Sequence, residues 1–213
     1  MTAYDYCSGI LPYCYFGQSL YFLLGRSKRN NRLITFSGKN DPLESDPTET
    51  AAREGYEETL GCLLDKAAIL TRVRKCSAHE ILVSRTPRGM PCYTYLIEVP
   101  YRKHYTMSFH KTRDFLATMG IRTYFLQEMT DMKWLCARSM FTKIRHSWEK
   151  NNILTSSEQW DKILRLVKTD WTTIDSWRIG SRDDSETEET ELEALNYPPG
   201  LYPGQIRPCP GTS

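Results

Sequence analysis

Complete disulfide frameworks and zinc ribbons are the first classes that the sequence excludes. The chain has seven cysteines, an odd number, and no two of them stand at C-x-x-C spacing. A complete framework pairs an even number of cysteines, and a zinc ribbon takes its ligands from closely spaced pairs. Free thiols are typical of a reducing compartment. We therefore expect an intracellular, cytoplasmic protein.

Long apolar runs are also missing. No stretch approaches the roughly 18 uninterrupted apolar residues that indicate a membrane-spanning helix. The first residues do not combine basic side chains, an apolar run and a small-residue cleavage site, which together mark a secretory signal. The sequence thus predicts a soluble protein with no membrane partner.

The charge is nearly balanced overall but not along the chain. The 213 residues carry a formal net charge of +2, yet residues 181–213 hold seven acids against two arginines. That segment has a net charge of −5, which leaves +7 on residues 1–180. A moderately basic body suits an anionic ligand such as a nucleotide or RNA, and it is equally typical of an ordinary solvated surface.

The first part of the chain predicts strands followed by a helix. Three β-prone runs, at residues 10–16, 20–24 and 33–36, are separated by glycine and polar residues, which indicates a hairpin and a third strand. Asp46 then offers a helix cap, with proline next and Glu49 at the third helical position. Gly61 is placed to end this helix after residue 60.

The rest of the first 180 residues alternates between the two kinds of element. Strands are expected at residues 67–73, 80–84, 93–99 and 132–135, and a short helix at 112–119. Residues 155–167 begin with a capping box and continue with apolar residues at helical spacing, which predicts a helix that packs on the core. This alternation is typical of a layered α/β domain.

The last 33 residues differ in composition. They are acidic and then rich in proline and glycine, with too little apolar surface to offset the entropy of ordering. We predict one domain over residues 1–180 and a disordered tail over residues 181–213.

Chemistry is concentrated in one acidic helix. If residues 47–60 are helical, Glu54, Glu57 and Glu58 share one face, because they stand at i, i+3 and i+4. Like charges at that spacing repel by about 0.2–0.5 kcal/mol per pair. Carboxylates held close together on a rigid element are what Mg²⁺ requires, whereas a solvated acidic face is the ordinary alternative.

This segment resembles the signature box of the Nudix hydrolases. That box consists of a glycine, five residues, Glu, seven residues, and then Arg-Glu, two residues, Glu-Glu, one residue and Gly. The matching residues are Gly38, Glu44, Arg53, Glu54, Glu57 and Glu58. The chain departs from the pattern in three places: the spacer after Glu44 holds eight residues, Gly55 stands at a usually apolar position, and the closing glycine, Gly61, comes one place late.

The resemblance implies a fold and a set of roles. The fold would be a Nudix-type α/β/α sandwich with a mixed sheet. Glu57 and Glu58 would be the main ligands of Mg²⁺ or Mn²⁺, with the backbone carbonyl of Gly38 completing the coordination. Glu54 would be a further ligand or the base that activates water, and Arg53 would orient a carboxylate, Glu54, through bidentate hydrogen bonds.

Three further residues receive weaker roles. Lys39 would contact substrate phosphate, and Glu44 would bind substrate or form a salt bridge within its loop. Glu128 precedes a predicted strand and is the best-placed later carboxylate to serve as the base or to help hold a metal; an ordinary surface role is the alternative.

Two other features carry less information. The four histidines show no metal-ligand spacing. Residues 101–113 are basic and aromatic, which would suit a groove for a nucleotide or RNA, and a plain exposed loop is the alternative.

Three functions follow for testing. The first is a metal-dependent pyrophosphohydrolase, acting on the acid anhydride of a nucleoside diphosphate derivative or of capped RNA. The second is a catalytically silent Nudix module that binds a nucleotide, RNA or a protein partner, which the change at Gly55 would favour. The third is an interaction protein whose acidic helix face is simply solvated.

Overall fold

A long first strand organises the sheet. The computed structural model describes residues 5–16, 19–86, 88–121 and 128–137, together with residues 162, 163 and 165. Strand β1 (Cys7–Phe16) pairs along one edge with β6 (Pro91–Glu98) in parallel. Its other edge pairs antiparallel with β4 (Phe36–Lys39) at its beginning and with β2 (Ser19–Ser27) at its end.

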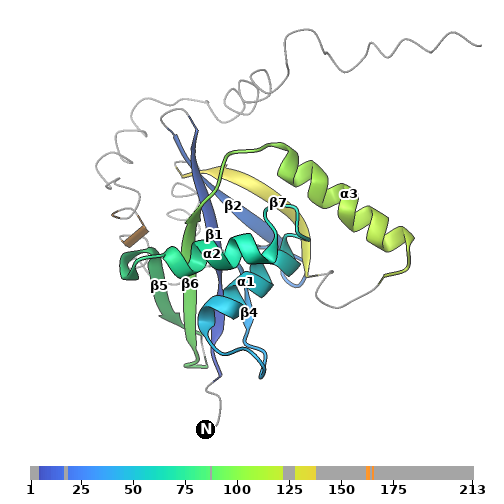
Figure 1. The fold of residues 1–213 in the computed structure, drawn as a ribbon. Helices are drawn as coiled ribbons and strands as arrows, with labels where there is room; N and C mark the ends of the chain where they lie inside the picture. Colours follow the sequence, from blue (N-terminus) through green and yellow to red (C-terminus); the bar gives the residue numbers. More distant parts are fainter. Residues whose placement is uncertain are drawn as a thin grey trace, which may run out of the picture. The chain divides into compact units, whose positions relative to one another are not determined.

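Three more strands complete a seven-stranded mixed sheet. Strand β5 (Ile81–Arg85) pairs antiparallel with β6, while β3 (Leu33–Ile34) and β7 (Met129–Cys136) both pair antiparallel with β2. Figure 1 shows this arrangement, with β1 and β6 side by side and β7 next to β2. The sheet with its helices is an α/β fold, as predicted.

Both faces of the sheet are covered. In β1 and β2 the alternating residues Ile10 and Leu23 lie in one core cluster, and Leu11, Phe22 and Leu24, which point the other way, are equally buried. Strands that are buried on both faces read as continuous apolar runs, which explains the unbroken stretch at residues 20–24.

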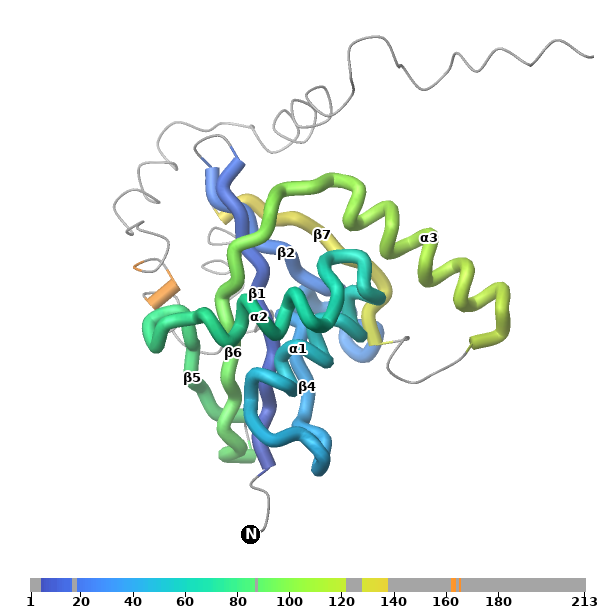
Figure 2. The backbone as a smooth tube through the Cα atoms, viewed as in Figure 1, coloured from blue at the N-terminus to red at the C-terminus, as the bar shows by residue number. Residues whose placement is uncertain are grey.

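Helices cover the face of the sheet that carries Ile10 and Leu23. Helix α1 (Pro47–Glu58) packs on β1 and β4, α2 (Lys66–Lys75) packs on α1, and α3 (His104–Thr118) packs against β7. In the tube view α1 and α2 again cross in front of β1, and α3 lies beside β7 (Figure 2). A short 3-10 helix, η1 (Ala78–Glu80), leads into β5.

Two sequence predictions about these elements are wrong. Residues 67–73 were expected to form a strand but lie in helix α2, where Asp65 caps the helix by accepting a hydrogen bond from the backbone N–H of Ala68. The two fully buried residues, Ile69 and Val73, stand four apart, so the apolar run packs as one helical face. Helix α3 also begins at His104, eight residues before the predicted start.

The other strands were predicted correctly to within a few residues, with the run at 33–36 divided into β3 and the start of β4. No helix in the described part of the chain is long and apolar enough to cross a membrane. The predicted helix at 155–167 lies largely outside the described residues, although Ile163 within it is fully buried. The predicted tail at 181–213 lies outside them altogether.

Candidate metal and catalytic site

The start of α1 is fixed by its cap. Asp46 accepts hydrogen bonds from the backbone N–H groups of Thr48 (2.7 Å) and Glu49 (3.3 Å), and Pro47 occupies the first helical turn. The side chain of Glu49 accepts in turn from the N–H of Ser45 at 2.9 Å. The capping prediction is confirmed, and it sets the helical phase of every residue that follows.

The end of α1 comes earlier than predicted. The helix stops at Glu58 with Thr59 as its cap, because Leu60 and Gly61 both adopt positive φ, 53° and 67°. The hydroxyl of Thr59 donates to the carbonyl of Gly55 at 2.6 Å, and the N–H of Gly61 reaches back to the carbonyl of Tyr56 at 2.8 Å. Glu58 therefore lies on the last helical position, close to the sheet.

The three glutamates of α1 differ in exposure. Glu54 is 7% exposed and Glu58 is 3% exposed, whereas the side chain of Glu57 is 23% exposed. Glu58 receives a hydrogen bond from the backbone N–H of Ser37, but its Oε2 atom has no hydrogen-bond partner among the described residues. The interpretation of this face as merely solvated is wrong, because two of its three carboxyl groups are buried.

Burial and mutual repulsion raise the pKa of the two buried acids. Desolvation is the largest cause for Glu54, whose pKa rises from 4.5 to about 7 even though Arg53 pulls it down. The pKa of Glu58 is raised well above 4.5, first by desolvation and then by the charges of Glu54 and Glu128. The structure therefore brings Glu128, which stands just before β7, into the electrostatic range of both acids.

Arg53 holds the acidic side chains together. Its Nη1 donates to Glu54 Oε1 at 2.7 Å and to Glu57 Oε2 at 3.1 Å. Its Nε donates to Glu44 Oε1 at 2.7 Å, and its Nη2 donates to Glu44 Oε2 at 3.3 Å. Nη2 also donates to the backbone carbonyl of Lys39 at 2.9 Å. The bidentate partner of Arg53 is thus Glu44, and Glu54 receives a single hydrogen bond, contrary to the prediction.

Glu44 receives hydrogen bonds both from helix α1 and from its own loop. Besides Arg53, the hydroxyl of Thr50 donates to Glu44 Oε2 at 2.6 Å and the backbone N–H of Asp41 donates to the same atom at 2.7 Å. Burial would raise the pKa of Glu44, but the hydrogen bonds from Arg53, Thr50 and Asp41 lower it below 4.5. Glu44 therefore ties the loop to α1; its predicted contact with substrate stays a prediction.

The Glu54 carboxyl lies against the backbone of Gly38. A Cβ atom at Gly38 would lie 2.3 Å from Glu54 Oε1 and 2.6 Å from Oε2, closer than any real contact. The residue must therefore lack a side chain for the Glu54 carboxyl to reach strand β4. A metal ligand role for the Gly38 carbonyl stays a prediction.

Gly55 is explained by the close approach of α1 to the sheet. A Cβ there would lie 2.6 Å from Ile10 Cδ1 and 3.5 Å from Ile69 Cδ1. The apolar contact that is usual at this position is therefore supplied from β1 and α2. Ile10 and Ile69 thus fill the space beside Gly55, beneath the face that carries the three glutamates.

Lys39 lies at the edge of the site and is exposed. Its ammonium group pairs with Asp5 at 3.0 Å, and both side chains are more than half exposed. Substrate contact by Lys39 stays a prediction.

The carboxylate oxygens of this site are donors of the type that a divalent metal prefers, but they are not arranged around a common point. In the described ranges no three carboxylate, histidine or cysteine side chains form a group that is already set to hold a metal. Arg53 instead occupies one oxygen of Glu54 and one of Glu57. No described residue hydrogen-bonds to Oε2 of Glu58, and burial together with the neighbouring carboxylates raises the pKa of both Glu54 and Glu58. A divalent cation would favour the ionised form of both acids.

Two residues of the site escaped the sequence analysis. Ser37 donates its backbone N–H to Glu58, and Thr50 donates its hydroxyl to Glu44. A backbone donor carries no sequence signal. Thr50, however, stands one helical turn before Arg53, a position from which it could have been considered.

Most of the basic, aromatic stretch at 101–113 forms a helix that packs on the core. From His104 it is helix α3 and not an exposed loop, and Tyr105 and Phe109 are buried in the core. Tyr101 packs against the rings of Phe16 and Trp134 at centroid distances of 4.7 and 5.4 Å. Among the histidines, His110 Nε2 lies 2.9 Å from Asp131 Oδ1.

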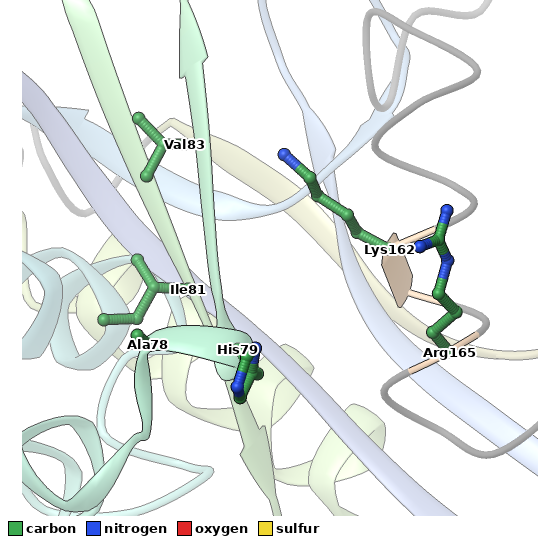
Figure 3. Close-up of a pocket in the computed structure, with 6 residues that line it drawn as sticks. All are labelled: Ala78, His79, Ile81, Val83, Lys162 and Arg165. Atoms are coloured by element: carbon green, nitrogen blue, oxygen red, sulfur yellow. The ribbon is translucent and has the colours of Figure 1, made fainter.

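A separate pocket of about 510 Å³ lies at β5, away from the glutamates. Figure 3 shows the side chains that line it, three apolar and three basic: Ala78, His79, Ile81, Val83, Lys162 and Arg165. None of the predicted site residues lines it.

Comparisons with known proteins give limited matches. No family model matches the sequence, and no curated protein matches it. Among solved structures, the chain is similar to a C. elegans Ap4A hydrolase in a binary complex, with 14% identity, 76% of this chain and 98% of that chain covered, and a TM-score of 0.42. It is also similar to the NUDIX domain of Shewanella oneidensis NrtR complexed with ADP ribose, with 15% identity, 67% and 79% covered, and a TM-score of 0.36.

Proposed function

We propose that this chain is a Nudix-type pyrophosphohydrolase that requires Mg²⁺ or Mn²⁺ and cleaves the diphosphate linkage of a nucleoside diphosphate derivative or of capped RNA. The observation that carries the proposal is the buried Oε2 of Glu58, which has no hydrogen-bond partner among the described residues and lies near the charges of Glu54 and Glu128. A buried carboxylate without a partner destabilises a fold. A divalent cation would offset that penalty, because hard oxygen donors are its preferred ligands.

Glu57 and Glu58 would hold the metal, with Glu54 and the carbonyl of Gly38 as further donors. When bound, the metal would neutralise charge on the substrate phosphates and lower the pKa of a bound water. To bind it, Glu54 and Glu57 must each offer an oxygen that Arg53 does not occupy. Each has one, because Arg53 contacts Oε1 of Glu54 and Oε2 of Glu57.

When Glu54 does not bind the metal through its free oxygen, it is the residue that we assign to the general base. A carboxyl group with a pKa of about 7 is partly ionised at neutral pH and still basic enough to take a proton from an attacking water. Arg53 would fix the orientation of that carboxyl by its 2.7 Å hydrogen bond, and its own position is set by Glu44. Glu128 is the other candidate for the base.

Thermal unfolding with and without metal tests the site. We expect Mg²⁺ or Mn²⁺ to raise the Tm of the wild type. At a hundredfold excess of metal over Kd, the free energy of unfolding should increase by about 2.7 kcal/mol. Glu58→Gln should lose this effect, and Glu49→Gln, a glutamate of the same helix outside the cluster, should keep it. If Glu58→Gln were stabilised by metal as strongly as the wild type, the proposed site would be wrong.

Turnover then tests catalysis. The substrate panel consists of dinucleotides, nucleoside triphosphates, ADP-ribose and capped RNA, and at least one of them should release phosphate. Glu58→Gln should lower the turnover rate by about 10²–10³-fold, since a metal supplies several kcal/mol of transition-state stabilisation. The silent binding module is the second candidate, and the pairing of Arg53 with both Glu54 and Glu57 favours it. Metal-dependent stabilisation without turnover of any substrate in the panel would support that candidate.

A further inference from the structure

Two cysteines face each other across the centre of the sheet. Cys7 in β1 and Cys92 in β6 are direct register partners in a parallel pair. Neighbouring strands lie about 4.8 Å apart, and the Cα atoms of a disulfide lie about 4.4–6.8 Å apart. Side chains of register partners point to the same face of the sheet, so the backbone already holds this pair at bridging distance.

The two sulfur atoms also interact. The side chains of Cys7 and Cys92 are hydrogen-bonded to each other, and Ser84, the register partner of Cys92 in β5, hydrogen-bonds to Cys92 as well. The hydrogen bond from Cys7 is the main cause that lowers the pKa of Cys92 from 9.0 to about 7, while the pKa of the donor, Cys7, is raised. Cys92 is therefore the member of the pair that ionises more readily, and a thiolate is the form that reacts.

The other cysteines of the described part do not share this arrangement. None of the six described cysteines is in a disulfide, and Cys7 and Cys92 are both partly exposed. Cys14 in β1 is buried. Cys14 and Cys136 in β7 are both register partners of Tyr21 in β2, so strand β2 lies between these two cysteines. Cys62 and Cys76 make hydrogen bonds to threonine or to backbone carbonyls.

The pair lies beside the acidic site but on the other face of the sheet. The next residue, Ser8, donates its hydroxyl to the carbonyl of Pro47 at 2.6 Å, so Ser8 points toward α1 and Cys7 points away from it. Ser8 is also the register partner of Gly38. A bridge between Cys7 and Cys92 would therefore join β1 to β6 next to the site without entering it.

We propose that Cys7 and Cys92 are a redox modification site that forms a reversible disulfide when the protein meets a peroxide. The Cys92 thiolate attacks one peroxide oxygen; the S–O bond forms as the O–O bond breaks, and the leaving hydroxide takes a proton to become water. The Cys7 sulfur then displaces the hydroxyl group of the sulfenic acid, and the Cys7 proton leaves with it as a second water. Two thiols are oxidised by two electrons, and one peroxide is reduced to two waters.

Mass spectrometry of the full chain tests this site. The reduced protein is treated with a stoichiometric amount of hydrogen peroxide, and its peptides are mapped without reduction. We expect a loss of two hydrogen masses, a peptide that joins Cys7 to Cys92, and full reversal by dithiothreitol. A joined peptide from other cysteines, or oxidation of Cys7 and Cys92 to separate sulfinic or sulfonic acids without a joined peptide, would overturn the proposal.

Variants separate the pair from its neighbours. Cys92→Ser should abolish the joined peptide, Cys7→Ser should leave Cys92 as a sulfenic acid that dimedone traps, and the matched controls Cys14→Ser and Cys136→Ser should behave as the wild type. An oxidation rate of Cys92→Ser equal to that of the wild type would overturn the assignment of the attacking thiolate. The wild-type peptide map stands even if a variant fails to fold, and all these readouts are independent of metal and of hydrolysis.

Discussion

The loop of residues 41–46 and the last turn of α1 each hold a glutamate of the acidic cluster, Glu44 and Glu58, and the surroundings of these two glutamates have opposite effects. In the loop, Glu44 receives hydrogen bonds from Arg53, Thr50 and Asp41, and its pKa falls. In the last turn, one oxygen of Glu58 has no hydrogen-bond partner in the described part of the chain, and the pKa of Glu58 rises. A satisfied carboxylate stabilises the loop, whereas an unsatisfied one destabilises the helix end, and the proposed cation would offset that penalty.

The largest effect that would separate these regions is a pH dependence. Without metal, the pKa of Glu54 is about 7 in the folded chain against 4.5 ordinarily, so the folded state binds a proton that the unfolded state has released. Its stabilising contribution is complete below pH 4.5 and is lost as the pH rises to about 7. A difference of 2.5 pKa units is on the order of 3 kcal/mol, and Glu58 acts in the same direction.

Urea unfolding in a chelator across this pH range measures the effect. The stability of Glu54→Gln should exceed that of the wild type increasingly as the pH rises, because the amide does not ionise. Added Mg²⁺ should remove the difference by stabilising the ionised wild type. Parallel curves for the two proteins would show that the burial of Glu54 has no energetic consequence.

Glu44→Gln probes the satisfied region. The amide is uncharged and has one oxygen in place of two. Either the Arg53 Nε–H or the Asp41 N–H therefore loses its acceptor. We expect a loss of about 2 kcal/mol, at the lower end for a partly buried ion pair because the Arg53 side chain is 22% exposed. Urea unfolding measures it.

Glu49→Gln is the matched control for this loss. Glu49 pairs with Arg74 at 3.5 Å, and both side chains are exposed by a third or more, so its change should cost less than about 1 kcal/mol. Equal losses for Glu44→Gln and Glu49→Gln would mean that the Glu44 network adds nothing to the stability of the loop.

The same contrast separates what the sequence could predict from what it could not. The common face of Glu54, Glu57 and Glu58 followed from helical spacing and the Asp46 cap, which are local properties. The partner of Arg53 depended on where the loop places Glu44, nine residues away in sequence, and spacing alone gave no distance. Helix α2 was mistaken for a strand because its β-branched residues favour strands, while tertiary packing of Ile69 and Val73 decided the outcome.

Gly55 marks a smaller effect on the packing beneath the acidic face. Gly55→Ala should gain up to about 1 kcal/mol in helix propensity, but its Cβ would press on Ile10, and overpacking costs about 1–3 kcal/mol. We expect a net loss of about 1 kcal/mol by urea unfolding. The second change Ile10→Val removes the Cδ1 atom that would be 2.6 Å away, so the double variant should lose less than the sum of the two single changes. Strict additivity would show that Ile10 does not fill the place of the missing side chain.

Lys39 should give the smallest effect on stability and the clearest division between structure and function. Its ion pair with Asp5 joins side chains that are 57% and 67% exposed, so Lys39→Ala and Asp5→Asn should each change the free energy of unfolding by no more than about 0.5 kcal/mol. Their effects on KM should differ. If Lys39 contacts substrate phosphate, Lys39→Ala raises KM several-fold, and added salt reduces the difference from the wild type. Asp5→Asn, which leaves the lysine and removes its competing partner, should lower KM or leave it unchanged. Equal rises in KM for both variants would mean that the ion pair only shapes the edge of the site.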